Sequence, residues 1–313
     1  MARRRKGRPV HGWIALDKPY ELGSTQAVAR VRRLFEAQKA GHAGTLDPLA
    51  TGMLPIALGE ATKTVPYLLD ADKAYRFTLA WGVSTDSVDA EGAEIARSDV
   101  RPSLEAVAAA LAAFTGEIDQ VPPAHSAVRV KGVRAYELVR KGVEVELQPR
   151  RVVIHEARVS GAPDADHVEI EIRCGKGTYV RSLARDLAAA LGACGHVSEL
   201  RRTRVGGFDE GRAVTLAELE RLVYEDRGSE ALLPVSTALD GIPALAVTAE
   251  DAFRLRQGRA VVLLPRQAEA LRDQLDEGAR TVSAFEGRQV VALCEMRAGR
   301  LNPVRVLHPD AGD

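Results

Sequence analysis

Apolar residues recur along this chain with two different spacings, and these spacings predict both helices and strands. Helical spacing predicts a helix over residues 25–38, with Ser24 as a candidate cap. Helices are also predicted over 103–115 and 180–191, and a glycine follows each of them. Apolar and polar residues alternate over 167–174, as in a strand with one buried face. The mixture of elements indicates an α/β fold of the mixed α+β kind.

The pattern changes in the last quarter of the chain. Residues 225–243 are rich in Gly, Ser, Pro and Asp and have no regular spacing, which predicts a linker. One short helix is predicted over 249–257. Strand-like runs follow it at 261–264, 281–285, 289–296 and 301–307. We therefore expect a large α/β domain at 11–235 and a small β-rich domain at 243–313.

Charge is balanced over the whole chain but uneven along it. Lys plus Arg and Asp plus Glu both number 43, so the net charge does not indicate a nucleic-acid partner. Segments 121–151 and 171–204 each carry seven basic and three acidic residues, whereas 85–120 carries two basic and eight acidic ones. Attraction to a polyanion needs only a local basic surface. The two basic segments are therefore candidates for RNA contact, although scattered solvated faces explain the same counts.

Several protein classes do not fit the sequence. The three cysteines, Cys174, Cys194 and Cys294, lie far apart without a C-x-x-C pair, so we expect neither a disulfide framework nor a metal site. No apolar run approaches the roughly 20 residues that span a membrane. Residues 1–10 carry five basic groups and no acid, and we interpret them as a basic arm rather than a targeting segment. We expect a cytoplasmic monomer with no membrane contact.

The segment 41–63 is the most unusual stretch, with four glycines and two prolines. This composition excludes a regular helix from its first half, and Pro48 favours an extended conformation of Asp47. The sequence thus predicts one carboxylate in a stiff, glycine-rich loop, where functional sites are often found. Alternatively, Asp47 only closes a turn, as Asp before Pro often does. No phosphate loop, Ser/His/Asp elbow or zinc-deaminase signature occurs in the chain.

The run GHAGTLDPLATG at residues 41–52 resembles the active-site motif of the TruB family of tRNA pseudouridine-55 synthases. Further blocks occur in the order that this family has. They are Asp17-Lys18-Pro19, Asp72-Lys73-Ala74-Tyr75, Thr85-Asp86 with Asp89, Lys176-Gly177-Thr178-Tyr179-Val180-Arg181, and Leu200-Arg201-Arg202. The similarity covers roughly residues 10–225. A motif of this length with five ordered blocks beside it makes coincidence a poor explanation.

The resemblance implies an isomerase that converts uridine to pseudouridine at position 55 in the T loop of tRNA. It implies a central mixed, largely antiparallel sheet followed by a PUA-like domain. The reaction needs no redox change and no group donor, so we expect no cofactor. The expected partner is the T stem-loop of tRNA, whose target base has to be flipped out of its stack.

The resemblance also implies roles for individual residues. Asp47 is implied as the catalytic nucleophile, although attack on the base, attack on the sugar and proton abstraction all remain open. Arg181 is implied to pair with Asp47, because a guanidinium favours the ionised carboxylate. Tyr75 is implied to stack on the flipped base and is a candidate proton relay. The substrate-binding residues implied in the same way are His42, Tyr179 and Leu200.

The roles of two lysines and of two regions are less clearly implied. Lys18 and Lys63 are expected either to contact phosphates or to form structural pairs, and we assign Lys18 to substrate binding. The basic segment 121–151 resembles the RNA-gripping insertion of the family. The tail, by contrast, matches the family weakly, and residues 205–313 carry a net charge of −5. This charge argues against a strong electrostatic grip on RNA by the last domain.

Three functions are compatible with these features. The first is the tRNA isomerase, and the second is an RNA-binding or tRNA-folding protein in which catalysis is incidental. The third is a synthase of the same fold that acts on another RNA. The trio Asp47, Tyr75 and Arg181 favours an enzyme, because binding alone does not require these three side chains. The insertion and the tail favour tRNA as the substrate.

Overall fold

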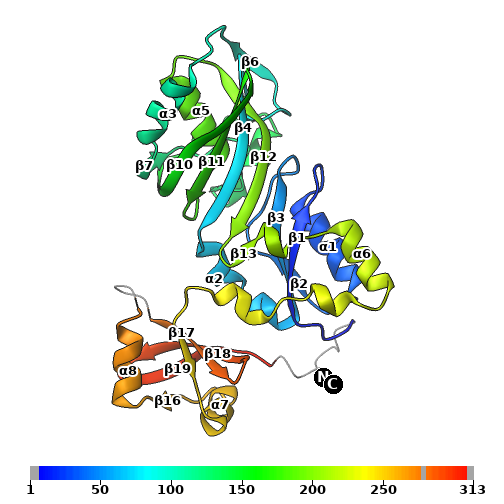
Figure 1. Cartoon of the computed structure of the whole chain (residues 1–313), viewed down its shortest axis with the longest axis vertical. Coiled ribbons are helices and arrows are strands. Elements are labelled where there is room, and N and C mark those ends of the chain that lie inside the picture. Colours follow the sequence, from blue (N-terminus) through cyan, green and yellow to red (C-terminus); the bar gives the residue numbers. More distant parts are fainter. Residues whose placement is uncertain (1–6, 276–279, 309–313) are drawn as a thin grey trace.

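A computed structural model describes residues 7–275 and 280–308 (Figure 1). Its largest element is a ten-stranded sheet with the order β14-β1-β3-β12-β4-β11-β10-β7, in which β13 pairs with β12 and β2 with β3. The pairs β1–β14 and β3–β12 are parallel and the others antiparallel, so the predicted mixed, largely antiparallel sheet is confirmed. The strands are β1 (Gly12–Lys18), β2 (Ala40–His42), β3 (Thr51–Leu58), β4 (Lys73–Trp81), β7 (Gly116–Gln120), β10 (Arg150–Asp164), β11 (His167–Cys174), β12 (Gly195–Val205), β13 (Phe208–Asp209) and β14 (Val214–Thr215).

Helices cover the two halves of this sheet separately (Figure 1). Helices α3 (Leu104–Ala112) and α5 (Val180–Ala190) pack on the half formed by β4, β11 and β10. Helices α1 (Ser24–Leu34) and α6 (Leu216–Tyr224) pack on the half formed by β1 and β3. Tyr75 on β4 and Leu200 on β12 contact both hydrophobic cores. The central strands β4 and β12 therefore form the boundary between the two halves.

Shorter elements connect these layers. The 3-10 helix η1 and helix α2 follow β3, and two small hairpins lie between β4 and β10. The remaining elements are η1 (Gly59–Lys63), α2 (Val65–Asp70), β5 (Val83–Thr85), β6 (Glu94–Arg97), β8 (Arg129–Val130), β9 (Val133–Arg134), α4 (Ala135–Val139), η2 (Glu210–Arg212), η3 (Gly228–Ala231) and η4 (Val235–Leu239).

The first helix differs from its prediction at both ends. Gly23 rather than Ser24 is the N-cap of α1, and the Ser24 hydroxyl instead bonds the backbone of Leu46, with both distances 2.9 Å. The helix ends at Leu34 instead of continuing to residue 38, because Glu36 has a φ of +49° that a right-handed helix cannot contain. Ser24 therefore ties this helix to the residue that precedes Asp47. The strand predicted over 167–174 is confirmed with the same bounds, and the helices predicted over 103–115 and 180–191 are found at Leu104–Ala112 and Val180–Ala190.

A second, five-stranded sheet follows residue 243, in the order β15-β17-β18-β19-β16. Its own core includes Leu255, Val282 and Leu301, so the predicted β-rich domain is confirmed. One helix, α8, was not predicted, because only Ala268 and Leu271 mark its buried side within a polar segment. The elements are β15 (Ala244–Ala246), α7 (Ala249–Arg256), β16 (Val261–Val262), α8 (Pro265–Arg272), β17 (Thr281–Glu286), β18 (Gln289–Arg297) and β19 (Arg300–Val306).

Polar contacts join the second sheet to the large domain. The Lys63 ammonium lies 2.6 Å from a Glu60 carboxylate oxygen and donates to the Val306 carbonyl at 2.8 Å. The His308 amide donates to the same Glu60 oxygen, also at 2.8 Å. Of the two roles expected for Lys63, a phosphate contact or a structural pair, these contacts therefore favour the structural pair. The domain limits at 235 and 243 stay predictions, and η3 and η4 lie within the expected linker.

Two further expectations concern the basic N-terminal arm and contact with a membrane. Most of the basic arm expected at residues 1–10 lies outside the described residues, because the description begins at Gly7. Within residues 7–275 and 280–308, no helix has the length and apolar character that a membrane crossing requires.

Candidate active site

The glycine-rich segment forms a loop between β2 and β3 that carries Asp47. Gly52, at the end of this loop, has a φ of +94°, a conformation that residues with a Cβ rarely adopt. A Cβ at Gly52 would lie 2.3 Å from the carbonyl oxygen of Arg202 on the neighbouring strand β12. Glycine is therefore required where the loop joins the sheet.

We expect Gly52→Ala to lower the free energy of unfolding by at least about 2 kcal/mol, because strained backbone and a steric contact would add. Gly41→Ala is the matched control, since a Cβ there has no heavy atom within 4 Å and the φ is not positive. This control should change the stability by less than about 0.5 kcal/mol. Urea unfolding followed by circular dichroism measures both variants. Equal losses would show that the close approach at Gly52 costs nothing.

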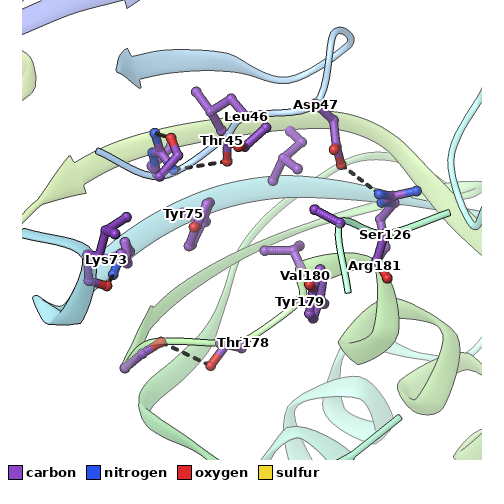
Figure 2. A pocket seen from close by; sticks show the side chains of 17 residues that line it. Thr45, Leu46, Asp47, Lys73, Tyr75, Ser126, Thr178, Tyr179, Val180 and Arg181 are labelled. Atoms are coloured by element: carbon purple, nitrogen blue, oxygen red, sulfur yellow. Dashed lines mark hydrogen bonds and ion pairs between the residues drawn. The ribbon is translucent and has the colours of Figure 1, made fainter. Parts of the chain in front are cut away.

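Asp47 and Arg181 point toward each other (Figure 2), and both line the same cavity. The Asp47 Oδ2 atom lies 2.8 Å from the Arg181 Nη2 atom. The Asp47 side chain is 44% exposed, whereas that of Arg181 is only 7% exposed. The carboxylate is thus open to a ligand while its cationic partner is fixed inside the protein.

Further contacts hold Arg181 in place at the start of α5. Its Nη1 atom donates to Asp89 Oδ2 at 3.1 Å and to the Ser87 carbonyl at 2.9 Å. Its Nη2 atom donates to the His125 carbonyl at 2.9 Å. Asp89 belongs to one of the blocks that resemble the family, but no role was predicted for it. The sequence held no signal for this contact, because Asp89 and Arg181 lie 92 residues apart and only the tertiary fold brings them together.

The cavity below Asp47 has a volume of about 330 Å³. Tyr75, Tyr179 and Leu200 line it together with the Asp47–Arg181 pair, so the structure brings five of the predicted site residues together. Tyr75 extends from the central strand β4 (Figure 2). Burial raises the pKa of the Tyr75 hydroxyl, and the neighbouring Arg202 guanidinium acts in the opposite direction. The phenol therefore stays protonated at neutral pH.

Tyr179 is fixed through its backbone. Its amide donates to the side-chain oxygen of Gln120 at 2.8 Å, and the Gln120 amide group donates to the Tyr179 carbonyl at 3.1 Å. Gln120 ends β7 and is buried, so this pair connects the edge of the sheet to the start of α5. Burial raises the pKa of the Tyr179 hydroxyl, which keeps this ring neutral as well. A rigid, neutral aromatic wall suits contact with an uncharged base.

Lys18 does not contact the cavity. Its side chain is fully buried, and its ammonium donates to the carbonyls of Pro19, Leu22 and Pro48 at 2.8–3.0 Å. Burial lowers the pKa of Lys18 to about 8. The assignment of Lys18 to substrate binding is therefore corrected, because a phosphate cannot reach an ammonium that the loop encloses. Its contacts show a structural residue beneath the loop that carries Asp47.

His42 lies at the end of β2, just before the loop, and is not among the residues that line the cavity. Burial is the largest cause that lowers the pKa of its imidazole, followed by the charge of Arg202. Its Nδ1 atom is buried and has no hydrogen-bond partner among the described residues. The ring is therefore neutral and holds one unused polar atom beside the site.

The basic insertion lies next to the same cavity. Ser126 and Ala127, near its start, line the cavity. Farther along, the guanidinium carbons of Arg134 and Arg140 lie 6.0 and 5.5 Å from the centre of the Tyr136 ring. These contacts keep cationic groups together on one short hairpin and helix.

Family models match most of the chain. Residues 32–180 match the model described as TruB family pseudouridylate synthase (N terminal domain), and residues 181–240 match tRNA pseudouridylate synthase B C-terminal domain. These matches cover the Asp47 loop, the Tyr75 strand and the start of α5. They end shortly before the five-stranded sheet begins.

Full-length relatives and solved structures agree with these matches. The tRNA pseudouridine synthase B proteins of Caulobacter sp. (strain K31) and Caulobacter vibrioides are 69% and 68% identical over 306 residues, which is 98% of this chain and 99% of each relative. A chain in "Crystal Structure of a Cbf5-Nop10-Gar1 Complex" aligns with a TM-score of 0.73 and 25% identity, covering 99% of this chain and 92% of its own length. The chain therefore belongs to the TruB family of pseudouridylate synthases.

Proposed function

We propose that this protein isomerises uridine to pseudouridine at position 55 in the T loop of tRNA, with Asp47 as the catalytic carboxylate. The observation that carries this proposal is the exposed Asp47 carboxylate, held 2.8 Å from the buried Arg181 guanidinium above a cavity lined by Tyr75. Family membership and the tRNA substrate named for the 68–69% identical relatives support the same reaction.

The chemistry balances without any added group. The bond between the ribose C1′ and uracil N1 breaks, the base turns, and a new bond forms between C1′ and C5. The hydrogen on C5 is lost to water, and N1 gains one. A single ionised carboxylate next to the sugar and base can support these steps, while Arg181 holds it in place.

The cavity also fits the flipped base. Extruding a stacked uridine costs a few kcal/mol, and stacking on an aromatic ring returns roughly 1–3 kcal/mol. In our proposal Tyr75 provides this ring, while Tyr179 and Leu200 form the walls of the base pocket. His42, which is only partly buried, contacts the RNA loop beside the site in this proposal, and the basic insertion at 121–151 binds its phosphates.

A tRNA transcript labelled with tritium at uracil C5 tests the proposal directly. We expect the protein to release tritium to water from one site in this transcript, because substitution at C5 displaces that hydrogen. A transcript with cytidine in place of the T-loop uridine is the matched control and should release none. Tight binding without release would favour the alternative of a tRNA-folding protein. Release that persists in the control would place the target at another position.

A further inference from the structure

A second buried arginine, Arg202, lies beneath the catalytic loop and has no role in the function proposed above. Its side chain is 1% exposed. Its Nε atom donates to the Met53 carbonyl at 2.8 Å, and its Nη2 and Nη1 atoms donate to the carbonyls of Gly44 and Thr45 at 3.0 and 3.4 Å. One guanidinium thus bonds the backbone on both sides of Asp47.

The backbone of Arg202 is equally central. In the sheet it pairs with Gly52 on β3 on one side and with Tyr75 on β4 on the other. Its carbonyl oxygen is the atom that a Cβ at Gly52 would meet at 2.3 Å. Arg202 therefore connects three parts of the site: the start of the loop, the end of the loop and the strand of Tyr75.

The charge of Arg202 makes these contacts obligatory. Among the described residues no carboxylate lies within ion-pair distance of it, and its side chain donates to the three loop carbonyls and also lies within hydrogen-bonding reach of the Tyr75 hydroxyl. A buried cation without a paired carboxylate depends on the dipoles around it. Movement of residues 44–53 would separate those carbonyls from the guanidinium. The loop is therefore fixed by a contact that is costly to break.

We propose that Arg202 is a positioning residue for the isomerisation, and this inference rests on the proposed role of Asp47. By bonding the carbonyls of Gly44, Thr45 and Met53, it sets the height and angle of the Asp47 carboxylate above Tyr75. The planar fork of a guanidinium is suited to this task, because it presents several donors in fixed directions. Catalysis is sensitive to such placement, since small misplacements of a reacting group slow the reaction strongly.

The test compares Arg202→Met and Arg202→Lys with Arg204→Met. Arg204 lies two residues farther along the same strand, is exposed, and donates to the Gly206 carbonyl, so it is a matched control. Single-turnover tritium release, tRNA affinity and melting temperature are measured for each. We expect Arg202→Met to slow single turnover by about 30-fold with the dissociation constant within threefold of wild type. The single-turnover rate of Arg202→Lys should lie between those of Arg202→Met and wild type. The rate and the affinity of Arg204→Met should match those of wild type within twofold.

A purely structural role would give a different result. It would reduce rate and affinity together, in proportion to the fraction of unfolded protein, and this outcome would overturn the proposal. A single-turnover rate for Arg202→Met within threefold of wild type would also overturn it. If Arg202→Met does not fold, Arg202→Lys carries the same comparison, because it keeps the charge and loses the fork. Wild-type protein that releases no tritium would contradict the proposed function instead.

Discussion

Asp47→Asn is expected to abolish turnover while RNA binding persists. The amide has nearly the shape of the carboxylate but cannot act as a nucleophile or accept a proton. We expect the single-turnover rate to fall by at least about 10⁴-fold, roughly 5.4 kcal/mol of transition-state stabilisation. The affinity for tRNA should stay within about tenfold, roughly 1.4 kcal/mol. Tritium release and filter binding on the same transcript measure both quantities.

The position of Asp47 supports this separation of the two effects. Its side chain is 44% exposed, and within residues 7–275 and 280–308 its ion pair is with Arg181 alone, so the fold does not depend on it. In the proposed function most RNA contacts, including those of the basic insertion at 121–151, come from side chains other than Asp47. Leu46→Met is a matched control in the same loop, because it alters a buried neighbour and leaves the carboxylate intact. Loss of affinity equal to the loss of rate would mean that Asp47 is structural.

The parts of the site that the sequence could predict are those defined by short, distinctive motifs. The Asp47 loop, Tyr75 and Arg181 each lie in a block of several consecutive matching residues, and the structure brings them to one cavity. The regular elements with clear periodicity, such as β11 and α5, were predicted for a related reason. A local pattern is enough to define them, whatever they pack against.

The parts that could not be predicted depend on contacts between distant segments. Ser24 was expected to cap its own helix, but its hydroxyl bonds Leu46 in a loop that only the tertiary fold brings close. Lys18 was assigned to the substrate, because its sequence does not reveal the three carbonyls that enclose it. Likewise, Arg202 on β12 donates to carbonyls of residues 44, 45 and 53, which lie about 150 residues earlier in the chain. No local pattern encodes such long-range acceptors.

Arg181→Lys is expected to slow turnover by about 100-fold, roughly 2.7 kcal/mol. The guanidinium contacts Asp47 and Asp89 and also donates to the carbonyls of Ser87 and His125. A lysine ammonium is a single point with three donors on a differently shaped stem, and it cannot reach all four acceptors at once. The exposed carboxylate, Asp47, is the partner that we expect to lose its contact.

The same substitution also tests how the two carboxylates share one cation. Asp89 is only 15% exposed, so leaving it unpaired costs more than leaving Asp47 unpaired. The lysine should therefore stay with Asp89, and the melting temperature should fall less for Arg181→Lys than for Arg181→Met, which leaves both carboxylates without a cation. Arg185→Lys, one turn later on α5 and 36% exposed at its side chain, is the matched control for both measurements. Turnover near the wild-type rate in Arg181→Lys would show that the reaction does not need the guanidinium of Arg181. Equal melting temperatures for the two Arg181 variants would show instead that Asp89 does not need a cation.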